Sequence, residues 1–257
     1  MSSYYAYHLG LETGAIEGAR IAFLPGDPGR VNRLAQIIDP DYRELQFHRE
    51  YRTSWVNCQG VKAIVTSTGI GGPSTAIAVE ELAQLGIKIF IRLGTTGAIQ
   101  PDIALGDFIV ATSAVRLEGT SHHYAPPSYP AVADWELVSL LTDACHGLNF
   151  KAHNGICASS DSFYPGQERY QTYNGYIIRD FQNSLEEWRR LNVLNYEMEA
   201  ATLFTMASVF KLKAAAVLAV IAQRTETEQV ALDIIPLVEE QLGRIARHVL
   251  GKIGSIA

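Results

Sequence analysis

Two arginines lie at places in the sequence where a small anion could bind. Arg30 follows the apolar segment Ile21–Leu24 and the turn PGDPG, and the spacing of the next apolar residues predicts a helix that begins beside it. Arg92 lies near the end of a second apolar segment, residues 87–93, just before the small-residue turn GTTG. Helix N-termini attract anions, and open α/β sheets bind ligands at the carboxyl ends of their strands. We therefore expect Arg30 and Arg92 to contribute to one oxyanion site.

Other charged residues have a more ordinary interpretation when the residues are considered alone. Arg49 lies in the charged segment QFHREYR between two expected strands, where a solvated hairpin position is the more common role. His8, just before Leu9 and Gly10, would most often be a surface histidine. The adjacent His122 and His123 could suggest a metal, but no further ligand falls at helical or hairpin spacing. We interpret their Pro- and Tyr-rich segment as a rim loop.

The segment after an expected strand at residues 155–159 combines an aromatic side chain with polar groups. Phe163 could stack on a planar ring, while Gln167 and Arg169 could hydrogen-bond to the edge of that ring. Two acidic residues, Glu197 and Glu199, fall in the segment NYEME that we expect to open a helix. Acidic side chains at a helix start commonly do no more than interact with the helix dipole, and that is the role the residues alone predict for both.

A βαβ unit lies at the centre of the expected architecture. Residues 63–67 are short, apolar and β-branched, as a strand buried on both faces should be. The glycines of residues 69–72 allow a tight turn, Pro73 suits the first helical turn, and Gly86 is placed to be the C-cap. Residues 87–93 return as the next strand and are expected to end in the turn that follows.

The same alternation continues along the rest of the chain. Further strands are expected at residues 21–24, 108–111, 155–159 and 214–222. Ser184 and Glu187 predict a capping box for a short helix, and an apolar stripe from Val238 to Ile253 predicts a final helix. No linker, repeat or low-complexity segment interrupts the pattern. The sequence therefore predicts an α/β fold in one domain that spans residues 1–257.

Composition excludes several classes of protein. The chain has 257 residues, 47% of them hydrophobic, and a formal charge of −6, which argues against nucleic acid or an anionic membrane surface as the main partner. Cys58, Cys145 and Cys157 are odd in number and lack CxxC spacing, so we expect neither a disulfide framework nor a zinc site. The N-terminus has no signal-peptide pattern, and the longest apolar run is too short to span a bilayer. We expect a cytoplasmic protein.

Three familiar sequence patterns are also missing. The sequence contains neither G-x-S-x-G nor GxxxxGK[ST]. The glycines at 69 and 71 do not complete a dinucleotide-binding pattern, because Ser74 stands where its third glycine belongs. A serine-hydrolase elbow, a P-loop and a dinucleotide fold are therefore not expected.

Several ordered segments together resemble a known family. They are residues 25–28 (PGDP), 67–84 (STGIGGPSTAIAVEELAQ), 92–101, 159–173 and 196–201. From about His8 to Arg224 the sequence resembles the uridine phosphorylases, within the type-I nucleoside phosphorylase family. The resemblance implies a single three-layer α/β domain around a mixed, partly barrel-like central sheet. It also implies the reversible phosphorolysis of uridine to uracil and ribose 1-phosphate, a pyrimidine-salvage reaction, by a homohexamer of dimers with shared active sites.

The resemblance further implies roles for particular residues. Those carrying the catalysis would be Arg92, Glu199 and Arg169. Phosphate, the co-substrate, would be bound by Gly26, Arg30, Arg49, Arg92 and Thr95. The ribose would be bound by His8, Met198 and Glu199, and the base by Phe163, Gln167 and Arg169. Arg49 and His8 would come from the partner subunit. The chemistry would need no metal or redox cofactor, but a structural potassium or sodium ion would bind through Glu50, Ile70 and Ser74.

Alternative functions remain at this point. Purine nucleoside phosphorylases of this family place an aspartate just after the strand that matches residues 214–222, whereas Gln223 and Arg224 stand here. A broad-specificity phosphorylase, a nucleosidase that uses water and a non-catalytic nucleoside-binding relative are the other candidates. The chain departs from its relatives at Gly29, where aspartate is common, at Gln223, where asparagine is usual, and in the lid sequence after Thr225.

Overall fold

The computed structural model of the chain describes residues 4–225 and 229–253. Its strands are β1 (Tyr5–Ala6), β2 (Leu11–Glu12), β3 (Ile21–Leu24), β4 (Arg43–His48), β5 (Tyr51–Cys58), β6 (Val61–Thr66), β7 (Ile89–Ala98), β8 (Phe108–Leu117), β9 (Ala131–Val132), β10 (Ala152–Ser160), β11 (Val193–Glu197) and β12 (Lys213–Gln223). Its α-helices are α1 (Pro28–Ile38), α2 (Gly72–Leu85), α3 (Trp135–Gly147), α4 (Ser184–Arg190), α5 (Ala200–Val209) and α6 (Ile235–Leu250). Short 3₁₀ helices are η1 (Thr120–His123), η2 (Pro165–Gln167), η3 (Arg179–Phe181) and η4 (Leu232–Ile234).

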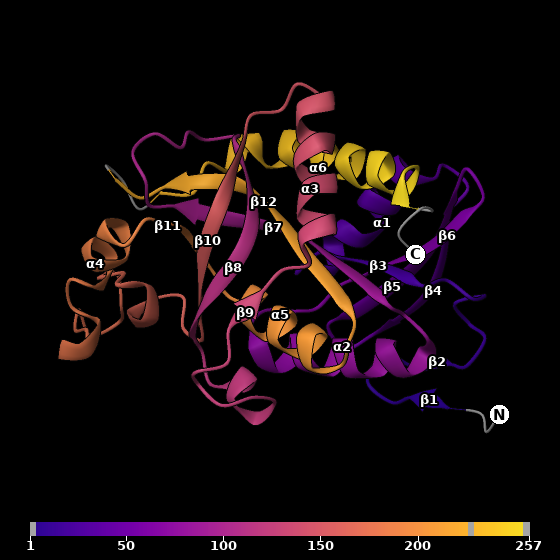
Figure 1. Ribbon diagram of the computed structural model, residues 1–257, viewed down its shortest axis with the longest axis horizontal. Coiled ribbons are helices and arrows are strands. Elements are labelled where there is room, and N and C mark those ends of the chain that lie inside the picture. The colour runs from indigo at the N-terminus through magenta and orange to yellow at the C-terminus, as the bar shows by residue number, and fades with distance from the viewer. Residues whose placement is uncertain (1–3, 226–228, 254–257) are drawn as a thin grey trace.

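Within these described ranges, ten strands form one sheet, and part of that sheet closes into a ring (Figure 1). β7 pairs in parallel with β12, β12 in antiparallel with β8, and β10 in parallel with both β8 and β11. β11 then returns to β7 through the pairs Asn195–Ala98 and Tyr196–Gly97. From β7 the sheet continues outward through β3, β6, β5 and β4. The mixed pairing and the closed ring confirm the predicted partly barrel-like sheet.

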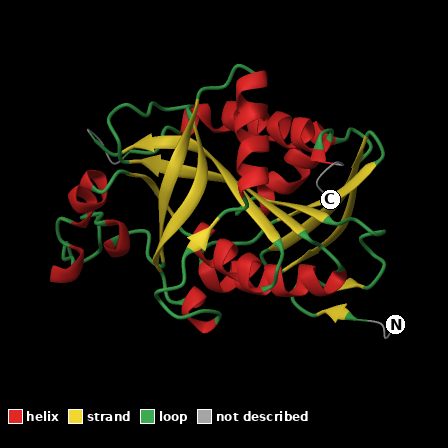
Figure 2. Ribbon diagram, viewed as in Figure 1, coloured by secondary structure: helices red, strands yellow, loops and turns green. Residues whose placement is uncertain are grey.

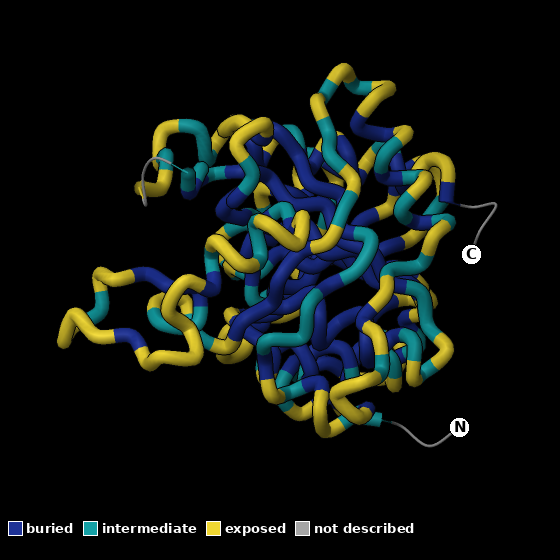
Figure 3. Tube along the Cα trace, turned by 60° about the vertical axis from the view of Figure 1, so that its left-hand side comes forward, coloured by how far each residue is buried: buried dark blue, intermediate teal, exposed yellow. Residues whose placement is uncertain are grey.

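Helices cover both sides of the strands (Figure 2). α1, α3 and α6 lie on one side, where Leu34, Leu141 and Leu242 belong to one apolar cluster with strand residues. α2 and α5 lie on the other side and contribute Leu82 and Phe204 to a second cluster. Figure 3 shows that the buried residues gather in the middle of the molecule while peripheral loops are exposed. The three-layer α/β arrangement predicted from the sequence is confirmed.

The βαβ unit forms largely as the sequence predicts. Its first strand, β6, covers Val61–Thr66, and its second strand, β7, begins at Ile89. The earlier strand β3 covers residues 21–24, and α1 begins at Pro28 after the N-cap Asp27, whose side chain accepts a hydrogen bond from the Gly29 N–H at 2.7 Å. α2 begins at Gly72 and ends at the C-cap Gly86, whose φ of 116° lies in the left-handed region that favours glycine. These short elements bring the two glycine-rich turns to one edge of the sheet.

The predicted turn after Arg92 is wrong, because β7 continues through it to Ala98. Gly94 pairs with Leu218 in β12, and a Cβ at residue 94 would lie 2.6 Å from the Leu218 Cδ2 and 3.0 Å from the Arg92 guanidinium carbon. Glycine is therefore needed here for close packing inside the sheet, and its absent side chain leaves room for Arg92.

The predicted helix start at Asn195 is also wrong. Asn195, Tyr196 and Glu197 belong to strand β11, which pairs with β10 and β7, and the helix α5 begins only at Ala200. Tertiary pairing outweighs the local helical pattern here, because β11 is the strand that closes the ring. Met198 and Glu199 consequently lie in the short connection between a strand and a helix.

The capping box predicted for α4 does not form. The N-cap is Asn183, in a left-handed conformation with φ 66°, and no cap side chain bonds to the helix. A long-range partner takes that role, since the Glu168 carboxylate accepts hydrogen bonds from the N–H groups of Asn183 (2.5 Å) and Leu185 (2.7 Å). Sequence-local signals could not have revealed a cap supplied from so far along the chain.

Other expectations concern cysteines and membrane segments. Cys58, Cys145 and Cys157 are all buried and free of disulfides. Across residues 4–225 and 229–253, the helices are too short or too polar for any of them to cross a bilayer.

Candidate active site

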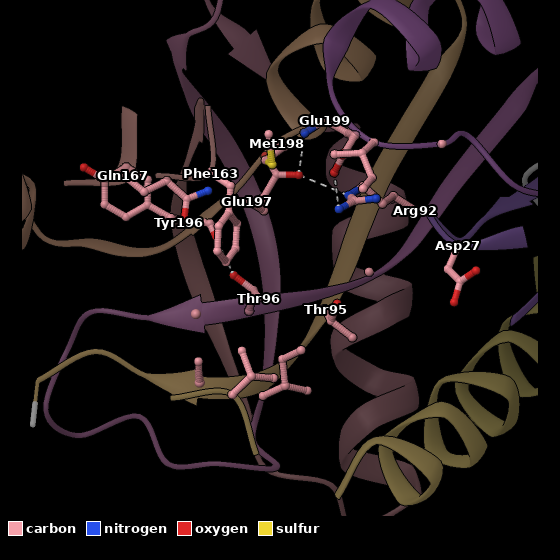
Figure 4. Close-up of a pocket in the computed structure, with 18 of the residues that line it drawn as sticks. Asp27, Arg92, Thr95, Thr96, Phe163, Gln167, Tyr196, Glu197, Met198 and Glu199 are labelled. Carbon is pink, nitrogen blue, oxygen red and sulfur yellow. Dashed lines mark hydrogen bonds and ion pairs between the residues drawn. The ribbon is translucent and has the colours of Figure 1, made fainter. Parts of the chain in front are cut away.

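A cavity of about 600 Å³ lies where the turns after β3 and β6 meet β7, β12 and the start of α5. Its walls include most of the residues to which the sequence resemblance gave roles. They are Gly26, Arg30, Glu50, Ile70, Ser74, Arg92, Thr95, Phe163, Gln167, Arg169, Met198 and Glu199. Figure 4 shows Phe163 and Gln167 on one side of Met198 and Glu199, and Asp27 on the other side. Residues from distant parts of the chain therefore converge on one space.

One end of the cavity is built by the start of α1 and by β7; we call it the anion end. Arg30, in the first turn of α1, donates from Nη1 to the Thr95 Oγ1 at 3.4 Å. Gly26 approaches the turn after β6 so closely that a Cβ there would lie 3.3 Å from the Gly69 carbonyl oxygen. The α1 N-terminus adds positive potential to the guanidinium group. Arg30 and Arg92 thus both line the same cavity, as the predicted oxyanion site requires.

Arg92 lies between two buried carboxylates (Figure 4). Its Nε contacts the Glu197 Oε2 at 3.1 Å, and its Nη2 forms an ion pair with the Glu199 Oε2. Burial would lower the pKa of Arg92, but the charges of Glu199 and Glu197 outweigh it and raise that pKa. The Nη1 has no hydrogen-bond partner among the described residues. A buried, fixed cation with a remaining donor is suited to an anionic ligand.

Glu199 joins the Arg92 region to the glycine-rich turn. Its Oε1 accepts a hydrogen bond from the Gly71 N–H at 2.5 Å. Burial raises the pKa of Glu199, the Arg92 charge opposes that shift, and the Glu197 charge adds to it. The role expected from the residues alone, a simple helix-dipole partner, is therefore wrong for Glu199, because its carboxylate faces Arg92 and Gly71.

Glu197 is a residue that the sequence reasoning underrated. Its carboxylate accepts hydrogen bonds from the Glu199 N–H at 2.9 Å, from the Ala200 N–H and from the Ser159 hydroxyl, besides its contact with Arg92. It does interact with the start of α5, as expected, but it also fixes the orientation of Arg92. The missed signal was the strand-like alternation of Asn195 and Glu197, which points both side chains inward.

The other end of the cavity, which we call the base end, is built by the segment of residues 161–183. The Arg169 guanidinium carbon lies 4.3 Å from the centroid of the Phe163 ring, and its Nε donates to the Gln167 Oε1 at 3.4 Å. Gln167 and Arg169 are buried, whereas Phe163 is 41% exposed. The predicted aromatic, amide and guanidinium group is brought together.

Arg224 contacts the backbone of that group. It follows β12 directly, is 3% exposed, and donates from Nη2 to the Gln167 backbone carbonyl at 2.8 Å. Arg224 directly follows an expected strand, and ligands bind at the carboxyl ends of strands in α/β sheets. The sequence could therefore have identified Arg224 as a site residue. Ile221, Ala222 and Val230 add an apolar wall to the cavity.

Two of the residues expected at the site do not line the cavity. Arg49 occupies the turn between β4 and β5 with φ 57°, is exposed, and lies 5.8 Å from the Tyr7 ring centroid. The His8 Nδ1 contacts the Glu81 Oε1 at 2.7 Å. Both residues were expected to act across a dimer interface. The structure contains a single chain, so this expectation remains a prediction.

The residues expected to hold a monovalent cation lie together at the margin of the cavity. The Ser74 hydroxyl donates to the Ile70 carbonyl at 3.0 Å, and a Cβ at Gly69 would lie 3.0 Å from both the Glu50 Cγ and the Ser74 Oγ. Carboxylate, hydroxyl and carbonyl oxygens are hard ligands, so the donor set fits a potassium or sodium ion. Among described residues, no three His, Cys, Asp or Glu side chains are grouped as a metal site.

Comparison with known proteins agrees with this geometry. The chain is 52% identical over 228 residues to the uridine phosphorylase of Escherichia coli, covering 89% of this chain and 90% of that protein. It is 51% identical over 222 residues to the uridine phosphorylase of Thermococcus kodakarensis (86% and 79%), and 40% identical over 210 residues to the guanosine phosphorylase of Halorubrum lacusprofundi (82% and 80%). Residues 20–251 match the family described as the phosphorylase superfamily. The chain therefore belongs to the phosphorylase superfamily.

Proposed function

We propose that this chain is a pentosyltransferase that catalyses the reversible phosphorolysis of uridine to uracil and ribose 1-phosphate. The high identity to uridine phosphorylases over most of both chains supports this substrate. We further propose a role in pyrimidine salvage in the cytoplasm. Inorganic phosphate is the co-substrate, and the reaction uses no redox cofactor.

One observation carries the proposal. One cavity of about 600 Å³ has Arg30 and Arg92 at the anion end and Gln167 and Arg169 at the base end. Figure 4 shows Glu199 between Gln167 and Arg92. A nucleoside that places its base against Gln167 would have its sugar beside Glu199 and its anomeric carbon open to a phosphate held by the arginines. This order of groups is the one that phosphorolysis requires.

The residues then divide the chemistry between them. Cleavage of the glycosidic bond develops positive charge on the sugar and negative charge on the departing base. Arg30, Arg92 and Thr95 bind phosphate and direct one of its oxygens at the anomeric carbon. Met198 and Glu199 hold the ribose, and the Glu199 carboxylate favours positive charge there. Phe163 stacks on the base, while Gln167 and Arg169 donate to its oxygens as negative charge accumulates.

A purine or broad-specificity phosphorylase is the alternative, since one relative is a guanosine phosphorylase. Against it, β12 ends at Gln223 and is followed by Arg224, where purine-specific relatives would carry an aspartate to protonate the ring. The Gln223 Oε1 accepts from the Thr225 hydroxyl at 2.5 Å. The Gln167 and Arg169 pair suits the imide edge of a pyrimidine.

A single set of assays decides among these functions. Uridine, deoxyuridine, thymidine and inosine are incubated with the purified enzyme, with and without inorganic phosphate, and the free base is measured. We expect phosphate-dependent release of uracil that exceeds release of hypoxanthine from inosine. Preference for inosine would support the alternative, cleavage without phosphate would indicate a nucleosidase, and binding without cleavage would indicate a non-catalytic relative.

We also propose a homohexamer assembled from dimers, in which Arg49 and His8 complete the site of the neighbouring subunit. The supporting observation is that neither residue lines its own cavity. Mixing dissociated Arg49→Ala and Arg92→Ala subunits tests this, because a mixed dimer would contain one complete site. We expect activity to return on mixing, and no return would show that Arg49 does not act across subunits.

A potassium or sodium ion at Glu50, Ile70 and Ser74 is proposed as structural. Neighbouring subunits would meet at this margin of the cavity, so the ion would stabilise the dimer and take no part in bond cleavage. Replacing both ions with a large organic cation should lower the melting temperature and leave kcat of the intact dimer unchanged.

The lid sequence after Thr225 begins with residues 226–228, which lie outside the described residues.

A further inference from the structure

A buried carboxylate on the last helix lies behind the anion end of the cavity. Glu239, in α6, is 3% exposed. Its Oε1 lies 2.9 Å from the Arg30 Nε and its Oε2 lies 2.8 Å from the Arg33 Nη1. These contacts are close ion pairs and not well-aligned hydrogen bonds. A buried carboxylate with two cationic neighbours is a charge arrangement that the apolar packing of α6 does not require.

The packing of α1 against α6 explains how Glu239 reaches Arg30. Gly243, one turn after Glu239, faces Ile37, one turn after Arg33, and a Cβ at residue 243 would lie 2.9 Å from the Ile37 side chain. The missing side chain therefore lets the two helices approach closely. Because residues four apart share a helix face, the same approach brings Glu239 against the first turns of α1.

Glu239 contacts the two arginines in different surroundings. The Arg33 side chain is 58% exposed and does not line the cavity, so solvent screens the Arg33 end of this ion pair. The Arg30 side chain is 12% exposed, lines the cavity, and also contacts Thr95 through Nη1. Holding the Nε end of Arg30 from behind leaves the Nη groups as the part that can meet a ligand.

We propose that Glu239 is a positioning residue that fixes the Arg30 guanidinium for phosphate. The inference rests on the proposed function, because it specifies how the phosphate site of that reaction is organised. Arginine has a long, flexible side chain, so fixing it before binding reduces the entropy that phosphate binding must overcome. The C-terminal helix thereby contributes to phosphate affinity without contacting the ligand.

The test compares Glu239→Gln, which removes the charge and keeps the shape, with Arg33→Ala, which removes the other partner of Glu239. KM for phosphate, KM for uridine and the melting temperature are measured for both. For Glu239→Gln we expect the phosphate KM to rise about tenfold, equivalent to about 1.4 kcal/mol, with uridine KM within about twofold. Arg33→Ala should leave both KM values within about twofold. Glu239→Asp should restore part of the phosphate affinity.

A merely structural ion pair would give a different result. In that case Glu239→Gln would lower the melting temperature while changing neither KM, or both KM values equally, and the inference would be wrong. If the wild-type enzyme showed no phosphate-dependent cleavage, the proposed function would fail, and calorimetric titration with inorganic phosphate would test Glu239 separately. Should Glu239→Gln fail to fold, Glu239→Asp is measured in its place, and unchanged phosphate affinity would overturn the inference.

Discussion

The anion end and the base end of the cavity are built in different ways. Arg30 and Thr95 belong to a helix and a strand of the central sheet, and Arg92 is 5% exposed between two carboxylates. The base end is carried by residues 161–183, which contain only the short helices η2 and η3 and extend beside α4 at the edge of the molecule (Figure 1). Phe163, at the base end, is 41% exposed. One end is part of the sheet and the other is attached to it.

This difference separates the part of the cavity that we propose binds phosphate from the part that we propose selects the nucleoside. Phosphate needs cations at fixed positions, and secondary structure fixes them. A base is recognised by hydrogen-bonding groups placed along its edge. Here a few long-range contacts hold the segment that carries those groups: Glu168 accepts hydrogen bonds at the start of α4, and Arg224 donates to the Gln167 carbonyl. We infer that changes in the loop alter which nucleoside is used, whereas changes in β7 alter whether any nucleoside is cleaved.

The largest expected effect is at the anion end. Arg92→Ala should lower kcat/KM by about 10³-fold for uridine and inosine alike, because it removes a charge-assisted contact with phosphate. Arg92→Lys keeps the charge but loses the planar guanidinium, and should lose activity less severely. Steady-state kinetics check both, with Arg244→Ala as control, because Arg244 is an exposed residue of α6 that does not line the cavity. Unchanged turnover of Arg92→Ala would remove Arg92 from the site.

Substitutions at the base end should have a selective effect. Gln167→Ala or Arg169→Ala should lower kcat/KM for uridine about 10²-fold, because each removes a donor to the departing base. The phosphate KM should change little. Measuring uridine and inosine in parallel checks the assignment, and an equal loss on both nucleosides would contradict it.

A smaller effect is expected at Glu168, which connects the segment of residues 161–183 to the start of α4. Glu168→Gln replaces one carboxylate oxygen with an N–H donor that faces the N–H groups of Asn183 or Leu185, at a cost of about 1–2 kcal/mol. We expect the uridine KM to rise several-fold while the phosphate KM stays constant. Glu186→Gln on the exposed side of α4 is the matched control, because its ion pairs with Arg189 and Arg190 lie at the surface. A change confined to the phosphate KM would contradict the separation of the two ends.

The smallest expected effect is a shift in the pH profile. Burial raises the pKa of Glu199 above its ordinary value of 4.5, and the ribose contact that we propose for Glu199 needs the ionised form. At saturating phosphate, kcat/KM for uridine should therefore begin to fall at a higher pH than an exposed glutamate would give. Glu199→Gln should show low activity without that acidic limb, and an unshifted limb that persists in Glu199→Gln would exclude Glu199 as its source.

Protonation of Glu199 should change the stability of the fold in the opposite direction to the activity. A carboxyl whose pKa is raised on folding stabilises the folded state below its unfolded pKa, and this contribution is lost as pH rises through the folded pKa. Acidification therefore increases the contribution of Glu199 to the free energy of unfolding while it removes the ionised form. Activity should therefore fall in acid without any unfolding caused by Glu199.

Local sequence patterns predicted the parts of the fold that obey local rules. The strand at residues 21–24, the C-cap at Gly86 and the apolar stripe of α6 all form as expected. The errors at Gly94 and Asn195 share one cause: both residues lie in strands that complete the ring, and ring closure is a long-range property that no short window contains.

The candidate site shows the same limit. Arg30 was predictable from its place after a strand and Arg92 from its place near the end of an apolar segment, but the partners that orient them were not. Glu197 reaches Arg92 from 105 positions along the chain. Glu239 had a detectable signal, because it is a charged residue on the buried face that also carries Leu242 and Ala246. Its connection to Arg30 required the approach of α1 and α6.

The closed ring also determines where the sheet can open. β4 forms one end of the strand order in the described part of the chain and pairs with β5 alone, whereas β7 is held by neighbours on both of its sides. Fraying should begin in the β4–β5 hairpin, the element that carries Arg49, and reach Arg92 last. A molecule that has lost its outermost strand would then keep Arg92 and its two carboxylate partners in register and would have displaced Arg49, the residue that we propose acts in the neighbouring subunit.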